Sequence, residues 1–214
     1  MNITIIANGD FPIRKTILDG IKAADRVVCC DGAFEKYVGW KGRGPQPVTV
    51  VGDGDSLAPE VLQEAAAAGL AFEWVQVEEQ EMNDLTKAVR YVVGLGEALE
   101  SITIVGATGL REDHTLGNIS LLAYYMEEYP DIRFRMLTDH GMFLPVRGEA
   151  TIATKAGQQV SLFSLTPEVP VSVEGLRWPI RDRCLTQWWQ GTLNEATADN
   201  FIVRGGTLLV YLTA

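Results

Sequence analysis

Aspartates that directly follow hydrophobic segments are the residues of this chain best suited to chemistry. The densest group is Gly-Asp-Gly-Asp-Ser at residues 52–56, which contributes Asp53 and Asp55. A helix cap needs only one acid, and the flanking glycines allow the backbone to approach a ligand closely. The pair therefore favours a binding role, whereas Asp31 or Asp113 alone could equally be a local cap or turn residue.

Carboxylates that lie close together require a cation among them. Two charges about 4 Å apart repel by roughly 1 kcal/mol in water and roughly 4 kcal/mol at an intermediate effective dielectric. A set of oxygen ligands with open positions suits Mg²⁺, which keeps waters and binds substrate phosphates. Zinc is disfavoured because Cys29 and Cys30 are adjacent strand residues that point to opposite faces, and Cys184 is distant in sequence. His114 and His140 alone make no closed site.

Residues 80–87, Gln-Glu-Met-Asn-Asp-Leu-Thr-Lys, combine acidic, neutral and cationic side chains. On a helix, Asp84 and Lys87 lie three residues apart and share a face. The acid could hold a metal while the ammonium meets phosphate oxygens. The alternative is an ordinary surface ion pair, which contributes little to stability.

Arg111, Asp113 and His114 follow a loop with the sequence Gly-Ala-Thr-Gly at residues 106–109. Such a loop can bring backbone N–H groups and a guanidinium toward an anion. The chain contains neither a Gly-x-x-x-x-Gly-Lys-Ser/Thr loop nor a complete Gly-x-Gly-x-x-Gly motif, so neither an ordinary P-loop enzyme nor a dinucleotide-dependent oxidoreductase is indicated. The remaining interpretation is phosphoryl-type transfer, in which carboxylates and a metal replace the glycine cradle.

The elements that must position these residues alternate between strand and helix. Short, nearly continuous apolar segments predict strands at 26–30, 48–51, 72–77 and 101–105, and helical spacing predicts helices at 59–68, 85–93 and 116–127. This order predicts a parallel sheet with right-handed crossovers. Ligands bind outside the carboxyl ends of such strands, so we expect one crevice to receive the aspartates that follow them. These are Asp31, Asp53, Asp55, Asp84 and Asp113.

The pattern changes after Asp139. Short strand-like segments at 142–146, 149–154, 159–165, 169–173, 201–204 and 207–212 are separated by glycine and proline. Many short strands with such turns predict a β-sandwich or a barrel-like pair of sheets. We therefore expect an α/β domain at residues 1–140 and a β-domain at residues 141–214.

Composition narrows the classes of partner. The formal net charge of -10 opposes binding to nucleic acid polymers or to an anionic membrane surface, but it permits a small phosphorylated substrate that arrives with a metal. Three cysteines make no disulfide framework. No secretory signal or membrane-length apolar segment is evident, which predicts a cytoplasmic location.

Several motifs, in order along nearly the whole chain, resemble those of the thiamine pyrophosphokinase family. Each motif alone is weak, but the ordered set is specific. They are Ala-Asn-Gly at 7–9 with Pro12, Asp-Gly-Ala at 31–33, the 52–56 and 80–87 segments, Gly-Leu-Arg-Glu-Asp-His at 109–114 with Asn118, Ser-Leu-Phe at 161–163, Gly-Leu-Arg-Trp-Pro at 175–179, and Asn-Glu at 194–195.

The resemblance implies transfer of a pyrophosphoryl group from ATP to the hydroxyl of thiamine, with Mg²⁺, giving thiamine diphosphate and AMP. It implies an α/β fold with an N-terminal Rossmann-like, mainly parallel sheet and flanking helices that binds ATP and Mg²⁺. A C-terminal β-sandwich would bind thiamine and form a homodimer with shared active sites. Two alternatives remain open: a Mg²⁺-dependent phosphohydrolase, or a non-catalytic sensor of thiamine or a nucleotide.

The resemblance also implies roles for individual residues. The metal ligands would be Asp53, Asp55 and Asp84, and these act catalytically with Lys87, Arg111 and Asp113. The ATP-binding residues would be Asn8, Gly9, Asp31 and Asn118, and the thiamine-binding residues Gln80, Ser172 and Trp178. Either Asp84 or Asp113 could accept the hydroxyl proton. For Trp178, packing in the sandwich core or an interface is the alternative to stacking on thiamine.

Three positions depart from the family pattern. Asn83 stands where the family usually has threonine, which keeps a polar cap before the helix of Asp84. Leu193 replaces a serine, and Ala196 replaces an aromatic residue. The last two changes leave room for an altered substrate preference and do not affect the acidic residues.

Overall fold

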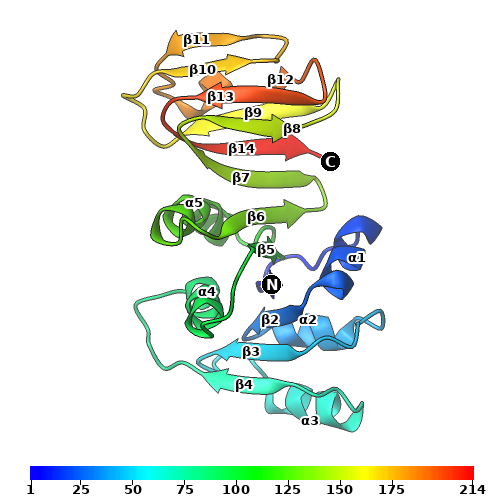
Figure 1. Cartoon of the computed structure of the whole chain (residues 1–214). Coiled ribbons are helices and arrows are strands. Elements are labelled where there is room, and N and C mark those ends of the chain that lie inside the picture. The colour runs from blue at the N-terminus through cyan, green and yellow to red at the C-terminus, as the bar shows by residue number, and fades with distance from the viewer. The chain divides into compact units, whose positions relative to one another are not determined.

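The computed structural model describes residues 1–214 and divides into two compact units (Figure 1). The first unit comprises Met1–Ile119 with Asp131–Asp139, and the second comprises Ser120–Pro130 with His140–Ala214. No helix is both long enough and apolar enough to cross a membrane.

The first unit is built on six parallel strands in the order β6-β5-β1-β2-β3-β4. Strands β1, β2, β3 and β5 are buried along nearly their whole length, which explains why the sequence shows continuous apolar segments there. Strand β4 has no buried residue, and β6 alternates between exposed and buried residues in its first half. The bounds are β1 Asn2–Ile6, β2 Arg26–Cys30, β3 Val48–Gly52, β4 Glu73–Gln76, β5 Ser101–Val105 and β6 Arg133–Thr138. The mainly parallel sheet predicted from the sequence is confirmed.

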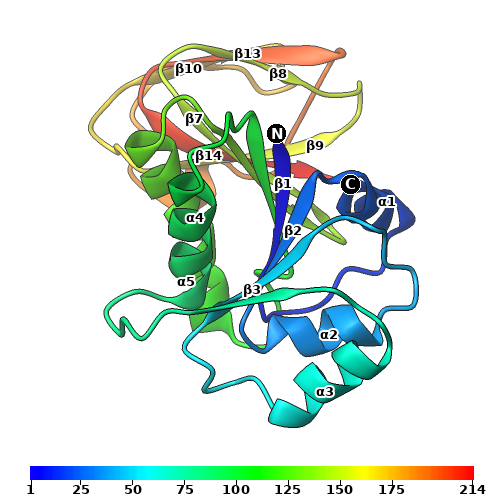
Figure 2. The same ribbon diagram turned by 60° about the horizontal axis from the view of Figure 1, so that its bottom comes forward.

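Helices cover both faces of this sheet, with α1, α2 and α3 on one side and α4 on the other (Figures 1 and 2). Cys29 of β2 belongs to the core beneath α1–α3, which includes Ile21 and Phe34. The neighbouring Cys30 faces α4, where its Sγ lies 3.6 Å from the backbone oxygen of Asp84. The helices are α1 Lys15–Ala23, α2 Ala33–Gly39, α3 Pro59–Ala67, α4 Asp84–Gly94 and α5 Glu112–Glu128.

The strand order reverses between β1 and β5, because the chain first adds β2, β3 and β4 on one side and later β5 and β6 on the other. The loops that leave β1 and β5 are joined there: Gly9 N–H donates to the Gly106 oxygen at 2.6 Å, and Asp10 N–H to the Thr108 oxygen at 2.8 Å. A Cβ at position 9 would lie 2.4 Å from the Thr108 oxygen, so only glycine permits this approach. Such a reversal is where open α/β sheets bind ligands.

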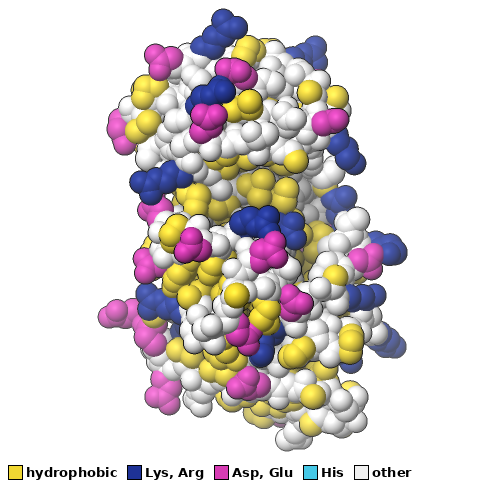
Figure 3. All heavy atoms as spheres, in the orientation of Figure 1, with side chains coloured by type: hydrophobic (Ala, Val, Ile, Leu, Met, Phe, Trp, Pro, Cys, Tyr) yellow, Lys and Arg dark blue, Asp and Glu magenta, His cyan; other side chains and the backbone are white.

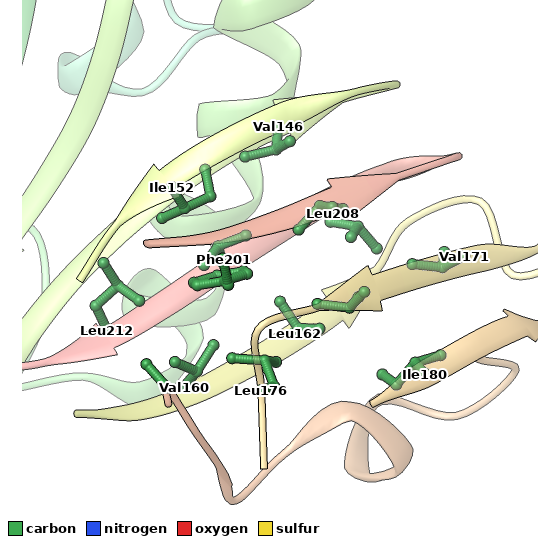
Figure 4. Close-up of a cluster of buried hydrophobic side chains, with 14 of the residues drawn as sticks. Val146, Ile152, Val160, Leu162, Val171, Leu176, Ile180, Phe201, Leu208 and Leu212 are labelled. Atoms are coloured by element: carbon green, nitrogen blue, oxygen red, sulfur yellow. The ribbon is translucent and has the colours of Figure 1, made fainter. Parts of the chain in front are cut away.

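The second unit packs two antiparallel sheets, ordered β12-β9-β14-β7 and β11-β10-β13-β8. Residues from both sheets, among them Val160, Leu162, Phe201 and Leu208, form one buried core (Figure 4). The unit is therefore a β-sandwich, as predicted. Its strands are β7 Gly141–Arg147, β8 Ala150–Ala153, β9 Gln159–Ser164, β10 Val171–Glu174, β11 Ile180–Arg183, β12 Asn194–Glu195, β13 Asn200–Arg204 and β14 Thr207–Thr213, with a 3₁₀ turn, η1, at Trp188–Gly191.

Acidic and basic side chains are intermingled on the face drawn in Figure 3. That face offers no continuous basic surface for a polyanion, which agrees with the formal net charge of -10.

Candidate functional site

A cavity of about 430 Å³ opens at the carboxyl ends of β1, β2, β3 and β5, within the first unit. It lies at the strand-order reversal and brings together residues from five separate segments. Eight of the residues predicted from the sequence line it: Asn8, Gly9, Asp53, Gln80, Asp84, Lys87, Arg111 and Asn118. Asp31, Asp55 and Asp113 are not in its lining.

The ammonium of Lys87 is the central charge of this cavity. Its side chain is 2% exposed, and Nζ lies 2.9 Å from Asp53 Oδ2 and 3.2 Å from Asp84 Oδ1. Burial lowers the pKa of Lys87, but the hydrogen bonds and charges of the two carboxylates outweigh burial and raise it overall. The hydrogen bond from Lys87 is also the largest cause that lowers the pKa of Asp53. This is a buried bridge between two acids rather than an ordinary surface pair.

Both oxygens of Asp53 are engaged within the protein. Oδ1 accepts from the backbone N–H of Asp55 at 3.2 Å, and Oδ2 accepts from Gln80 Nε2 at 3.3 Å in addition to Lys87. Gln80, which the resemblance assigned to thiamine, therefore lies against the acidic residues. The side chain of Asp55 is exposed beside them.

Asp31 is almost completely buried and is held in an unfavourable backbone conformation. It is 1% exposed, with a φ of 27°, in the left-handed region that non-glycine residues seldom adopt. Oδ2 accepts from Ser56 N–H at 2.8 Å, whereas Oδ1 has no hydrogen-bond partner. Burial raises the pKa of Asp31, and the charges of Asp84, Asp53 and Asp55 add to this effect. The carboxylate thus anchors the segment that carries the acidic pair.

The acidic residues chemically fit a hard cation. The charges of three carboxylates, those of Asp84, Asp53 and Asp55, add to burial in raising the pKa of Asp31. A single ammonium, that of Lys87, bridges two of these carboxylates. Oδ1 of Asp31, which is buried without a hydrogen-bond partner, is a further sign that negative charge is in excess here. No group of three or more His, Cys, Asp or Glu side chains is arranged to enclose a metal. Mg²⁺ needs no such cage, because it is usually held by one or two carboxylates together with substrate phosphates and waters.

Arg111 supplies the second cation of the cavity. Its guanidinium forms a two-point pair with Asp113, with Nη2 2.5 Å from Oδ2 and Nε 3.1 Å from Oδ1. Both side chains are exposed, so a phosphate could displace the pair at little cost. The hydrogen bond from Arg111 lowers the pKa of Asp113 to about 2.

Lys36 was not predicted from the sequence, although it supports the loop after β1. Its Nζ donates to the backbone oxygens of Asn8 at 2.9 Å and of Gly9 at 2.6 Å. Burial lowers the pKa of this ammonium. In the sequence, a lysine in the last turn of helix α2 resembles any other helix lysine, so only the tertiary structure identifies this contact.

A smaller cavity of about 250 Å³ in the second unit contains Trp178, Leu193 and Asn194. Trp178 is 56% exposed, which rules out the alternative that it is core packing within this chain. Asn194 clamps its backbone: Trp178 N–H donates to Oδ1 at 3.1 Å, and Nδ2 donates to the Trp178 oxygen at 2.7 Å. The guanidinium of Arg177 lies 5.1 Å from the centre of the Trp178 ring.

The other second-unit positions are arranged differently. Ser172 is not in the lining of this cavity, and its hydroxyl accepts from Asp182 N–H at 2.9 Å. Leu193 is 78% exposed with a φ of 60°, so an apolar side chain projects where the family pattern has serine. Ala196 is fully buried opposite Leu176, where a larger aromatic side chain would need more space.

The fold and the cavity define a class of protein: an α/β unit whose cavity, lined by acidic and basic side chains, lies at a strand-order reversal, followed by a β-sandwich. Residues 18–134 match the family described as thiamin pyrophosphokinase, catalytic domain, and residues 141–211 match thiamin pyrophosphokinase, substrate-binding domain. The chain belongs to the thiamin pyrophosphokinase family.

Individual relatives agree with this membership. The chain is 30% identical over 144 residues to thiamine pyrophosphokinase 1 of Oryza sativa subsp. japonica, a match that covers 62% of this chain and 52% of that protein. The chain thus spans about half the length of this curated relative.

Solved structures show the same fold. Thiamine pyrophosphokinase of Bacillus subtilis matches with a TM-score of 0.81 and 21% identity, over 100% of this chain and 99% of that one. The Candida albicans enzyme matches with a TM-score of 0.80 and 18% identity, over 99% and 89% of the two chains. At these identities the likeness concerns the fold alone.

We predict that Asp31→Asn stabilises the protein at neutral pH while it impairs function. Asparagine Oδ1 can still accept from Ser56 N–H, but the buried charge beside three other acids is removed. The thermal midpoint, measured by circular dichroism at pH 7, should rise by a few degrees relative to the parent protein.

The pH dependence provides the control for this prediction. Because the folded-state pKa of Asp31 is raised above 3.8, the parent loses stability as pH rises through that shifted value, and the penalty is absent below 3.8. The advantage of the variant should therefore vanish in acid. A constant advantage from pH 3.5 to pH 7, or a lower midpoint throughout, would contradict the electrostatic explanation.

Proposed function

We propose that this protein transfers a pyrophosphoryl group from ATP to the hydroxyl of thiamine and so forms thiamine diphosphate and AMP. The observation that carries the proposal is that one chain matches the catalytic and the substrate-binding domains of the family, in order. The mixture of carboxylates and buried and exposed cations around the first-unit cavity supports it.

In this reaction the alcohol oxygen of thiamine attacks the β-phosphorus of ATP. A bond forms between that oxygen and the β-phosphorus, the bond from the β-phosphorus to the oxygen of the α-phosphate breaks, AMP departs, and the hydroxyl proton is released. Catalysis of such transfers is mostly positioning and stabilisation of spread negative charge. Lys87 and Arg111, which both line the cavity, would supply that stabilisation.

The nucleotide would lie along the loops that follow β1 and β5. Asn8, Gly9 and Asn118 line the cavity there, and Lys36 donates to the backbone oxygens of Asn8 and Gly9. Asp31 contributes by anchoring the 53–56 segment rather than by direct contact, because it is buried and bonded to Ser56. This differs from the direct ATP contact that the family resemblance implied for Asp31.

The residues that would hold Mg²⁺ are Asp53, Asp55 and Asp84. When bound, the ion would neutralise phosphate charge and orient the polyphosphate. Asp84 is the better candidate to accept the hydroxyl proton, because it lines the cavity and Asp113 does not.

Thiamine would be recognised by the second unit through the exposed ring of Trp178. Arg177 already lies over this ring, so we assign the flat pyrimidine or the cationic thiazolium to the opposite face. Gln80 and Ser172 complete the proposed thiamine set. We further propose that residues 1–140 act as the catalytic domain, that residues 141–214 act as the thiamine-binding domain, and that a homodimer completes each active site.

The first test is AMP release from ATP with Mg²⁺, in the presence and absence of thiamine. We expect AMP only when thiamine is present, in equal amount to thiamine diphosphate. Phosphate release without an acceptor would instead indicate a phosphohydrolase. Ligand binding without any turnover would indicate a sensor.

Asp55→Asn should abolish Mg²⁺-dependent turnover and leave the fold intact. The Asp55 side chain is exposed, so its substitution removes a ligand without disturbing packing. Turnover and thermal midpoint are measured together, with Glu60→Gln as the matched control, because Glu60 is an exposed acid of α3 outside the cavity lining. Near-normal activity of Asp55→Asn would refute its role in metal binding.

Trp178→Ala should weaken thiamine binding by about tenfold or more, the loss expected for one aromatic stacking contact, while ATP binding changes little. Trp189→Ala is the control, because Trp189 is 71% exposed and outside the cavity lining. Both affinities are measured by calorimetry. An equal loss of both affinities in Trp178→Ala would indicate disrupted packing rather than a lost stacking contact.

A further inference from the structure

A chain of two side-chain amides crosses the wall of the first-unit cavity. Asn83, the N-cap of helix α4, accepts from Thr86 N–H at 3.0 Å through Oδ1. Its Nδ2 donates to Asn118 Oδ1 at 3.2 Å, and Asn118 Nδ2 donates to the backbone oxygen of Ala107 at 2.9 Å. Asn83, Asn118 and Ala107 all line the cavity.

The backbone groups at the two ends determine the direction of this chain. A reversed Asn83 amide would point its NH₂ group at the N–H of Thr86, and a reversed Asn118 amide would point its oxygen at the oxygen of Ala107. Each reversal would lose a bond at the end and mismatch the amides in the middle. Only one arrangement therefore satisfies all three hydrogen bonds.

This chain of side-chain amides connects the two segments that carry the charged groups of the site. Helix α4 carries Asp84 and Lys87. Ala107 and Arg111 both lie in the loop between β5 and α5. Asn118 has one donor and its oxygen committed to these protein contacts, which favours a supporting role over a primary contact with nucleotide.

We propose that Asn83 is a positioning residue, whose amide holds the loop of Arg111 in alignment with the Lys87 and Asp84 pair. This inference rests on the proposed function and deepens it. Polyphosphate held between Lys87 and Arg111 needs a set spacing between these two cations, because small misplacements strongly reduce the rate of phosphoryl-type transfer.

The two roles of Asn83 can be separated by substitution. Thr and Asp both cap helices by accepting from the backbone, and neither has an amide N–H. The hydroxyl of Thr is a donor, but its oxygen stands one bond closer to the backbone than Nδ2 of Asn83, which donates to Asn118 at 3.2 Å. Asn83→Thr therefore keeps the cap and removes the bridge, whereas Asn83→Ala removes both. Comparing the two variants therefore separates the effect of the helix cap on stability from the effect of the bridge on the position of the Arg111 loop.

We expect the thermal midpoint of Asn83→Thr to equal that of the parent protein, and the thermal midpoint of Asn83→Ala to be lower. In Asn83→Thr the backbone amide of Arg111, which donates to the Gly109 oxygen at 2.8 Å, should exchange its hydrogen about fivefold faster, the effect of about one lost hydrogen bond. The kcat for AMP formation should also fall about fivefold, because the lost hydrogen bond no longer holds the Arg111 loop in position. The KM for thiamine should stay unchanged.

A double-mutant cycle with Asn118→Ala completes the test. If the two amides act as one chain, Asn83→Thr should lower kcat little further in the Asn118→Ala background. Fully additive losses, or parent-like exchange and kcat in Asn83→Thr, would overturn the proposal. If the parent protein shows no thiamine-dependent AMP release, the proposed function fails, and the exchange of the Arg111 amide still tests the bridge by itself.

Discussion

The placement of one buried ammonium among several carboxylates is the constraint on which the site depends. Parallel strands end at the same edge of a sheet, so residues that follow different strands are brought together whatever their separation in sequence. Here that edge collects acids, and Lys87 is buried between Asp53 and Asp84. The remaining carboxylate charge includes that of Asp31, whose Oδ1 has no hydrogen-bond partner. This excess of negative charge suits a metal-bound polyphosphate.

Close backbone approaches give this site its shape. Gly9 is required where the loops after β1 and β5 meet, and Gly52 is required because a Cβ there would lie 2.6 Å from the Cβ of Asp31. Asp31 itself adopts a φ of 27° and anchors Ser56. Strain and buried charge therefore accumulate at the binding edge, as is common where function, rather than stability, determines the local structure.

The second unit presents a different kind of surface. Its core is an ordinary sandwich interior, but Trp178 is clamped by Asn194 with its ring exposed, and Leu193 projects beside it. An aromatic ring fixed by its backbone loses little conformational entropy on binding, which suits recognition of a flat cationic ligand. Leu193, which lines this cavity and is largely exposed, gives the surface beside Trp178 an apolar character where the family pattern has serine.

The sequence by itself determined the order of elements. Apolar segments at 26–30 and 101–105 matched β2 and β5, because a strand covered on both faces must be apolar throughout. It did not identify β1, α1, α2 or β6, and helix α5 begins four residues before the predicted start at 116. Helices α1 and α2 have only 9 and 7 residues, and helices this short depend on packing more than on their local pattern. Strand β1, by contrast, lies between β2 and β5 and is buried from Ile3 to Ile6, so its pattern is like theirs.

Residue types and spacing also indicated the acids, Lys87 and Arg111, but only the tertiary structure decided what each does. It buried Lys87 between two carboxylates, removed Asp31 from solvent, and left Asp113 outside the cavity lining while pairing it with Arg111. It also brought Lys36 against the loop after β1, and Asn83 against Asn118. The physical reason is that burial, pKa and hydrogen-bond partners depend on neighbours distant in sequence. Those neighbours are known only once the strands have met at a common edge.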